Sequence, residues 1–110
     1  MEAKMLKIDI GKKKNRFSLK MDGHCGFDDE GKDIVCAAAS ILCLTLERVI
    51  KENSDKLIRT PDVDIKKGSC KIKFEAKDEY TAALTNVFYT VDSGFKILAN
   101  KYPDNVAISE

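Results

Sequence analysis

The sequence contains a single histidine, His24, so any mechanism that needs an imidazole must use this residue. Among the four cysteines, Cys36 follows His24 after a short glycine-containing stretch. A thiolate is a strong nucleophile, and an adjacent imidazole can take its proton and later return one to a leaving amine. The two residues therefore form a candidate pair for covalent acyl transfer. On residue type alone, Cys36 can equally be a small buried hydrophobic residue and His24 a surface group.

The segment from Asp22 to Lys32 is polar and contains three glycines, which predicts a loop. His24 lies between Gly23 and Gly26, where the missing side chains let another chain approach closely. An acidic cluster follows His24 in this loop, and no single acid stands out as the residue that would orient the imidazole. By proximity the candidates are Asp22, Asp28, Asp29 and Asp33.

A helix is expected to begin after Asp33, whose side chain can cap it, and to run to about Asn53. Cys36 would then occupy the third helical position, near unpaired backbone N–H groups and the positive end of the helix dipole, which favour a thiolate and can stabilise an oxyanion. The first turns of this helix are apolar on all sides, which predicts that its N-terminal half is buried. Ser40 lies one turn from Cys36 on the same face, so it either hydrogen-bonds within the site or bonds a backbone carbonyl.

The remaining pattern predicts two β-hairpins and a second helix. Apolar and polar residues alternate in the strands, and the second helix has apolar residues at intervals of three and four. The fold class is therefore α+β, with a largely antiparallel sheet, two packed helices and the order β-β-α-β-β-α, with a further short strand at the end. The expected elements are strands at Met5–Ile10 and Arg16–Met21 joined by a turn at Gly11–Asn15, strands around Val63–Ile65 and Cys70–Phe74 joined at Lys67-Gly68, a helix from Asp78 or Glu79 to just before Pro103, and a strand at Val106–Ile108.

Length and composition limit the classes of function. A chain of 110 residues can form one domain, expected over residues 1–110, and its 19 basic and 18 acidic residues create no global field toward nucleic acid or an anionic membrane. The longest uncharged stretch, Ile34 to Leu46, is shorter than the roughly 18 residues of a membrane helix. Met1 to Lys7 has no apolar signal core, which favours a cytoplasmic location and four free thiols.

The segment GHCGFDDEGKDIVCAAAS resembles the signature of the ribosomal-processing cysteine protease (Prp) family, whose members have a Gly-His near the end of the second strand and an Asp-Ile-Val-Cys-Ala-Ala-x-Ser helix start. The chain length and the order of elements also agree with that family. The matching residues are Gly23, His24, Gly26, Gly31, Asp33, Ile34, Val35, Cys36, Ala37, Ala38 and Ser40.

The resemblance implies a cysteine endopeptidase that removes the N-terminal extension of a large-subunit ribosomal protein precursor, cutting after an aromatic-containing motif. His24 and Cys36 would be its catalytic pair, and Asp33, Ser40, Gly23 and Gly26 would support them. Such an enzyme needs no cofactor and no metal. The resemblance also implies a homodimer, with nucleic acid encountered only indirectly through the ribosomal substrate.

In the family, the loop between the histidine and the cysteine covers the site until substrate orders it. Its acidic residues would here attract a basic ribosomal protein. Cys25 departs from the family, which usually has alanine at this place; it is either inert or able to pair with Cys36 on oxidation. The expected substrate loop comprises Cys25, Phe27, Asp28, Asp29, Glu30 and Gly31.

Three other functions compete with this interpretation. A zinc site would have only His24, Cys25 and Cys36 as ligands, without paired-cysteine spacing. A thiol redox protein would use Cys36 with Cys25 or Cys43 as its partner. A non-enzymatic ribosome-associated module would bind RNA or protein through lysines, although these have no interleaved aromatic residues to stack on bases. The lysines concerned are Lys12, Lys13, Lys14, Lys66, Lys67, Lys71 and Lys73.

Overall fold

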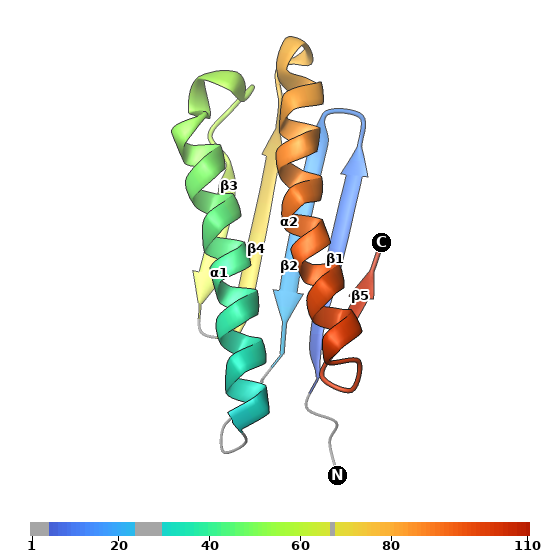
Figure 1. Cartoon of the computed structure of the whole chain (residues 1–110). Coiled ribbons are helices and arrows are strands. Elements are labelled where there is room, and N and C mark those ends of the chain that lie inside the picture. The colour runs from blue at the N-terminus through green and yellow to red at the C-terminus, as the bar shows by residue number, and fades with distance from the viewer. Residues whose placement is uncertain (1–4, 24–29, 67) are drawn as a thin grey trace.

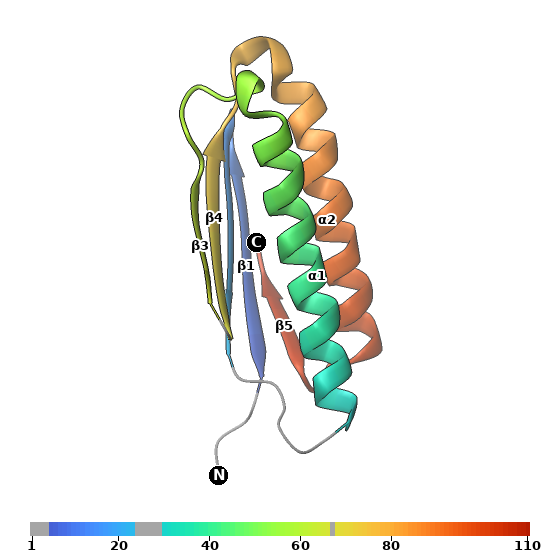
Figure 2. The ribbon, with the colours of Figure 1, turned by 90° about the vertical axis from the view of Figure 1, so that its left-hand side faces the viewer.

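The computed structural model describes residues 5–23, 30–66 and 68–110, with the backbone alone at 30–33. Two helices cover one face of a five-stranded sheet (Figures 1 and 2). The order β-β-α-β-β-α-β confirms the predicted α+β fold. The elements are β1 (Leu6–Lys13), β2 (Arg16–Asp22), α1 (Glu30–Glu52), the short 3-10 helix η1 (Ser54–Lys56), β3 (Asp62–Lys66), β4 (Ser69–Glu75), the 3-10 helix η2 (Asp78–Tyr80), α2 (Thr81–Lys101) and β5 (Val106–Ser109).

The strands lie in the order β3-β4-β2-β1-β5. All neighbouring pairs are antiparallel except β1 and β5, which run parallel and begin their pairing at Leu6 and Val106. Successive side chains of a strand point to opposite faces, so the alternating apolar residues of each strand reach the helices. The polar residues between them line the opposite face, which no other described element covers (Figure 2).

The first hairpin turns later than the sequence predicted. β1 continues beyond Ile10 because Gly11 pairs with Ser18 in the ladder, and the two lysines that follow extend it to Lys13. The turn itself is at Lys14 and Asn15, and Lys14 adopts a φ of 57°. The expected turn at Gly11–Asn15 was therefore wrong in its first three residues. Gly11 and the two lysines after it continue the ladder with β2, because exposed polar residues can remain in a strand where one face of the sheet meets water.

The helices differ in how well they match expectation. α2 buries the predicted apolar stripe, with Leu84, Phe88, Val91, Phe95 and Leu98 in the core. The prediction that the first half of α1 is buried was wrong, because Ile34 and Ile41 are 55% and 60% exposed. α1 instead buries a single stripe, which consists of Val35, Ala39, Cys43, Leu46 and Ile50.

The molecule is elongated, with extents of 47 × 23 × 19 Å. The end of β2 and the beginning of α1 lie at one end of the long axis, and the turn between β1 and β2 lies at the other (Figure 1). Within the described residues, no helix is long and apolar enough to cross a membrane.

Candidate active site

Gly23 holds the end of β2 in a conformation that only glycine adopts easily. Its φ is 140°, and its N–H donates to the carbonyl oxygen of Gly68 over 3.1 Å. A Cβ at this position would overlap the carbonyl oxygen of Met5 and lie 3.2 Å from Cα of Leu6. The backbone of β1 is therefore packed directly against Gly23, immediately before His24 in the chain.

Cys36 is half-buried on the first part of α1. Residues seven apart lie on nearly the same face of a helix, so Cys36 shares a face with Cys43. The Cys43 thiol lies 3.8 Å from Sδ of Met21, which places this face of α1 against β2. Cys36 is disulfide-bonded in the structure, contrary to the expectation of four free thiols.

Since β2 runs toward the end of the molecule where α1 begins, the contact between Cys43 and Met21 aligns the two elements (Figure 1). Cys36 lies roughly 10 Å from Cys43 along the helix, at 1.5 Å per residue. Gly23 lies roughly 7 Å beyond Met21 along the strand direction, at about 3.3 Å per residue. Cys36 and the end of β2 therefore lie at the same end of the sheet and at similar depths.

The helix begins earlier than expected, which changes the electrostatics predicted for Cys36. α1 starts at Glu30, so Asp33 lies inside the first turn and not at the N-cap position where it was expected. Cys36 is then beyond the four residues whose N–H groups have no partner within the helix. Because the dipole effect falls off within the first turn, it acts more weakly on Cys36 than predicted, and the N–H of Cys36 is not available to an oxyanion.

Several predicted site residues lie outside the described residues, namely His24, Cys25, Gly26, Phe27, Asp28 and Asp29. Glu30 and Gly31 were expected in the substrate loop, but they form the first turn of α1. Asp22 is exposed at the end of β2, and Ser40 is exposed on α1. The zinc alternative depends on His24 and Cys25, and no cluster of three metal-binding side chains occurs among the described residues.

The redox alternative finds no support in Cys43. This thiol is 1% exposed and free, and it lies beside the free thiol of Cys70 in the core. A hydrogen bond with Cys70, together with burial, raises the pKa of Cys43 well above its usual value. A thiol with a raised pKa forms little thiolate, so Cys43 is poorly suited to attack a disulfide.

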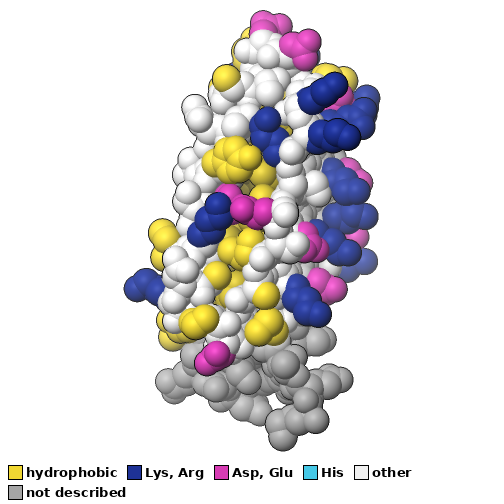
Figure 3. Space-filling view, turned by 90° about the vertical axis from the view of Figure 1, so that its right-hand side faces the viewer, with side chains coloured by type: hydrophobic (Ala, Val, Ile, Leu, Met, Phe, Trp, Pro, Cys, Tyr) yellow, Lys and Arg dark blue, Asp and Glu magenta, His cyan; other side chains and the backbone are white. Residues whose placement is uncertain are grey.

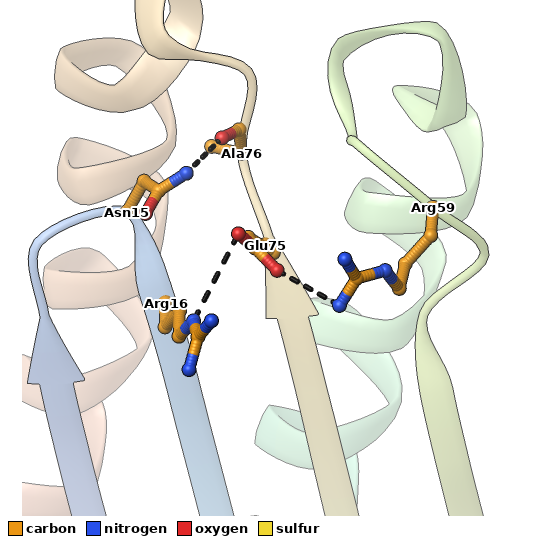
Figure 4. Close-up of polar contacts among 5 residues, drawn as sticks. All are labelled: Asn15, Arg16, Arg59, Glu75 and Ala76. Carbon is orange, nitrogen blue, oxygen red and sulfur yellow. Dashed lines mark hydrogen bonds and ion pairs between the residues drawn. The ribbon is translucent and has the colours of Figure 1, made fainter.

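At the other end of the sheet, the structure gathers charged residues that sequence analysis did not connect. Glu75 contacts both Arg16 and Arg59, with an Nε–Oε2 distance of 3.8 Å to Arg16 and an Nη1–Oε1 distance of 2.9 Å to Arg59 (Figure 4). These residues come from β2, β4 and the segment between η1 and β3, so no local pattern could reveal them. They border a groove of about 750 Å³ on the face of the sheet away from the helices.

The structure places only some of the lysines of the RNA-binding alternative at one site. Lys12, Lys13 and Lys73 line this groove. Lys66 and Lys71 are exposed elsewhere on the sheet, with Lys66 3.8 Å from Asp64. Figure 3 shows Lys and Arg side chains gathered along the sheet side of the molecule. Lys14 is in the β1–β2 turn, and Lys67 lies outside the described residues.

Comparison with solved structures identifies the same fold in bacterial proteins. SMU.848 from Streptococcus mutans is 24% identical, with a TM-score of 0.72 over 96% of this chain and 93% of that chain. The essential ribosomal processing protease Prp from S. aureus, in complex with a substrate peptide, is 20% identical, with a TM-score of 0.71 over 96% of this chain and 98% of that chain. The same S. aureus protease with a covalently linked product peptide gives a TM-score of 0.69 at 20% identity and the same coverage.

No curated protein matches the chain. The sequence model of the family described as cysteine protease Prp matches residues 5–107, which is nearly the whole chain. This match covers both hairpins, both helices and the start of β5, and it includes the segment from Gly23 to Ser40. The chain therefore belongs to the cysteine protease Prp family.

Proposed function

We propose that this protein is a cysteine endopeptidase that removes the N-terminal extension of a large-subunit ribosomal protein precursor. The nucleophile is the thiolate of Cys36, and His24 is the general base and acid. The observation that carries the proposal is the alignment of α1 with β2 through Cys43 and Met21, which brings Cys36 to the end of the sheet where β2 leads into His24. The family match and the S. aureus ribosomal processing protease support the substrate class.

In the proposed reaction, the imidazole of His24 takes the proton of the Cys36 thiol, and the thiolate attacks the carbonyl carbon of the scissile peptide bond. The C–N bond breaks as the imidazolium returns the proton to the leaving amine. Water, deprotonated by the imidazole, then hydrolyses the acyl-cysteine thioester. The S. aureus neighbour was captured with a covalently linked product peptide, and a covalent intermediate is what nucleophilic catalysis generates.

Only the reduced thiol of Cys36 can be the nucleophile in this mechanism, so a disulfide at Cys36 would prevent cleavage. We expect cleavage to require a thiol reductant such as dithiothreitol. Full activity after prior removal of reductant, with Cys36 still disulfide-bonded by mass spectrometry, would contradict this role of the thiolate.

The test uses a ribosomal protein precursor carrying an N-terminal extension, with cleavage followed by mass spectrometry under reducing conditions. Cys36→Ala, Cys36→Ser and His24→Ala are expected to lose cleavage by about 10,000-fold or more, as on removing a member of a catalytic triad. Cys70→Ala is the control, because it removes another thiol of the chain that lies in the core. Cleavage by Cys36→Ala at the wild-type rate would refute the mechanism.

We also propose a homodimer and a cytoplasmic location, where ribosomal precursors are made. Three exposed apolar residues along one side of α1 support an interface between two copies of the chain. They are Ile34, Ile41 and Leu44. In analytical ultracentrifugation, the protein should sediment as a dimer and the Ile41→Glu variant as a monomer. If the wild-type protein sediments as a monomer at micromolar concentration, the dimer proposal fails.

A further inference from the structure

A basic groove lies on the face of the sheet that the helices leave open, at the opposite end of the molecule from the beginning of α1 (Figures 1 and 2). Its volume is about 750 Å³, which is within the range of protein ligand sites. Five basic residues and two acidic residues contribute atoms to it, but the Nζ of Lys12 lies 5.6 Å from the centre of the buried Phe17 ring, on the helix side of the sheet. Four basic side chains therefore face the groove with two acidic ones, which gives it a positive balance although the whole chain has a net charge of only +1. The charged lining residues are Lys12, Lys13, Arg16, Arg59, Lys73, Asp62 and Glu75.

The two guanidinium groups of the groove are held by one carboxylate. The side chain of Glu75 is only 16% exposed, whereas those of Arg16 and Arg59 are 74% and 68% exposed. Each guanidinium has five N–H donors, and Glu75 engages a single nitrogen on each side, so the outer donors of both remain directed to solvent (Figure 4). Glu75 thus reduces the conformational freedom that Arg59 would lose on binding a ligand, whereas Arg16, at 3.8 Å, lies beyond hydrogen-bond distance and is attracted only by charge.

The backbone around this cluster is also fixed. The side-chain amide of Asn15 donates to the carbonyl oxygen of Ala76 over 2.7 Å, and the N–H of Ala76 donates to the carbonyl oxygen of Asn15 over 2.9 Å. These bonds tie the β1–β2 turn to the end of β4 (Figure 4). The basic side chains on either side of the groove are therefore mounted on one rigid frame.

Small side chains form part of the groove lining. Gly11, Ser18 and Thr60 contribute little bulk, and a Cβ added at Gly11 would meet only the Cβ of Ser18, at 3.9 Å. A chain-like ligand can therefore approach the strands between the basic residues. The aromatic lining residues, Phe17 and Phe74, are 2% and 5% exposed and stack on each other with ring centroids 4.6 Å apart, so they offer no free face to a base.

We propose that this groove binds the phosphodiester backbone of RNA without reading its sequence. Guanidinium forks match phosphate oxygens bidentately, and flexible lysines add positive charge around them. Since no aromatic face is available for stacking, affinity would come from the phosphates alone. The choice of RNA over DNA rests on the proposed function, because a ribosomal protein precursor is found with RNA. The groove would then contact nucleic acid directly, whereas the sequence predicted only an indirect encounter through the ribosomal substrate.

The test measures binding of a fluorescein-labelled single-stranded oligouridylate to the full chain carrying Cys36→Ala, by fluorescence anisotropy. With about three phosphates neutralised, affinity should fall about 20-fold between 50 and 200 mM salt. The variant Arg59→Gln/Lys73→Gln should bind at least 10-fold more weakly than its parent. Arg48→Gln/Lys101→Gln carries the same change of charge on the two helices and should bind as the parent does. Far-UV circular dichroism verifies that each variant is folded.

Gly11→Leu provides a second test, because it fills the groove without changing the charge. It should also weaken binding at least 10-fold. Equal affinity of the Arg59→Gln/Lys73→Gln protein and its helix control would overturn the site. Competition by poly-glutamate as effective as that by RNA would instead indicate an acidic protein as partner, and equal binding of single-stranded DNA would remove the preference for RNA. RNA binding is measured on the Cys36→Ala protein, which does not need to cleave. A failure to bind RNA is therefore distinct from a failure of the proposed protease activity.

Discussion

Replacing Gly23 by alanine tests whether the end of β2 is held as the structure indicates. At a φ of 140° a side chain is strained in itself, and the added Cβ would overlap the carbonyl oxygen of Met5. The obstacle is the backbone of β1, which cannot rotate away as a flexible side chain could. The variant must therefore separate the start of β1 from the end of β2 or change the backbone conformation of residue 23.

The expected cost follows from these two effects. A non-glycine residue in a sparsely populated backbone region costs about 1–3 kcal/mol. Relief of the overlap also endangers the hydrogen bond from Gly23 to Gly68, worth about 1 kcal/mol. We therefore expect Gly23→Ala to lower the free energy of unfolding by about 3 kcal/mol, a large part of the roughly 5–15 kcal/mol typical of a domain.

Urea unfolding followed by circular dichroism measures this change, with Gly11→Ala as the matched control. The Cβ of that control would meet only Ser18, at 3.9 Å, so we expect a change below about 1 kcal/mol. If the two variants differ by less than about 1 kcal/mol, the reasoning about the end of β2 is wrong. Under the proposed mechanism, Gly23→Ala should also lower the cleavage rate of the folded fraction by about 100-fold, because a misplacement of about 1 Å has that effect on catalysis.

Three further substitutions test the core. Burial raises the pKa of Asp92, so the folded state binds a proton more tightly than the unfolded chain, and stability falls as the pH rises from the ordinary value of 3.8 through the raised pKa. Asp92→Asn should remove this loss of stability with rising pH, measured by urea unfolding from about pH 4 to pH 8. If the free energy of unfolding of the variant and of the wild type depends on pH in the same way, the pKa of Asp92 is not the cause. A Cβ at Gly94 would lie 2.6 Å from Cδ2 of Leu42, so the Leu42 side chain must move in Gly94→Ala. The substitution should therefore stabilise less in the wild type than in a Leu42→Ala background, where helix propensity should give about 1 kcal/mol. A double-mutant cycle without coupling would exclude this contact. Phe88→Ala should cost about 3–5 kcal/mol in thermal or urea unfolding, because this 2% exposed ring packs on Phe17 with centroids 5.2 Å apart; a cost below about 1 kcal/mol would contradict the packing.

The strands and α2 could be predicted because their hydrophobic patterns have only one efficient way to be buried. Leu6, Ile8 and Ile10 alternate, so one face of β1 must meet the helices. The apolar residues of α2 recur at intervals of three and four, so they also define one face that must be buried, and Phe88 and Phe95 lie in the core as expected. Even the buried Asp92 follows from this geometry, because its place in the helix puts it on the stripe although its side chain is polar.

The first half of α1 could not be predicted in the same way, because it has too many apolar residues to define one face. Ile34 and Ile41 are as hydrophobic as Val35, and only packing against the sheet and α2 decides which of them is exposed. Its start was missed because Gly31 has a low helix preference and Asp33 is a good N-cap residue, so the helix was expected to begin after Asp33 and not at Glu30. Local preference is a weak prior that surrounding structure readily overrides.

The basic groove shows a different limit of sequence analysis. Arg16, Arg59 and Glu75 are widely separated in the chain, and each alone looks like an ordinary surface charge. Strand order brings them together, because β4 lies between β2 and β3 and the segment containing Arg59 leads into β3. A charge cluster that depends on sheet topology can be recognised only once the topology is known.

The earlier start of α1 changes which group must activate Cys36. With a helix beginning at Asp33, unpaired N–H groups and the dipole would share the stabilisation of a thiolate. With the start at Glu30, Cys36 lies beyond the first turn, and those contributions decline while the half-buried position still disfavours a charge. The proposed mechanism therefore relies on the imidazole of His24, and the glycine that holds the end of β2 becomes as important for catalysis as the helix that carries the thiol.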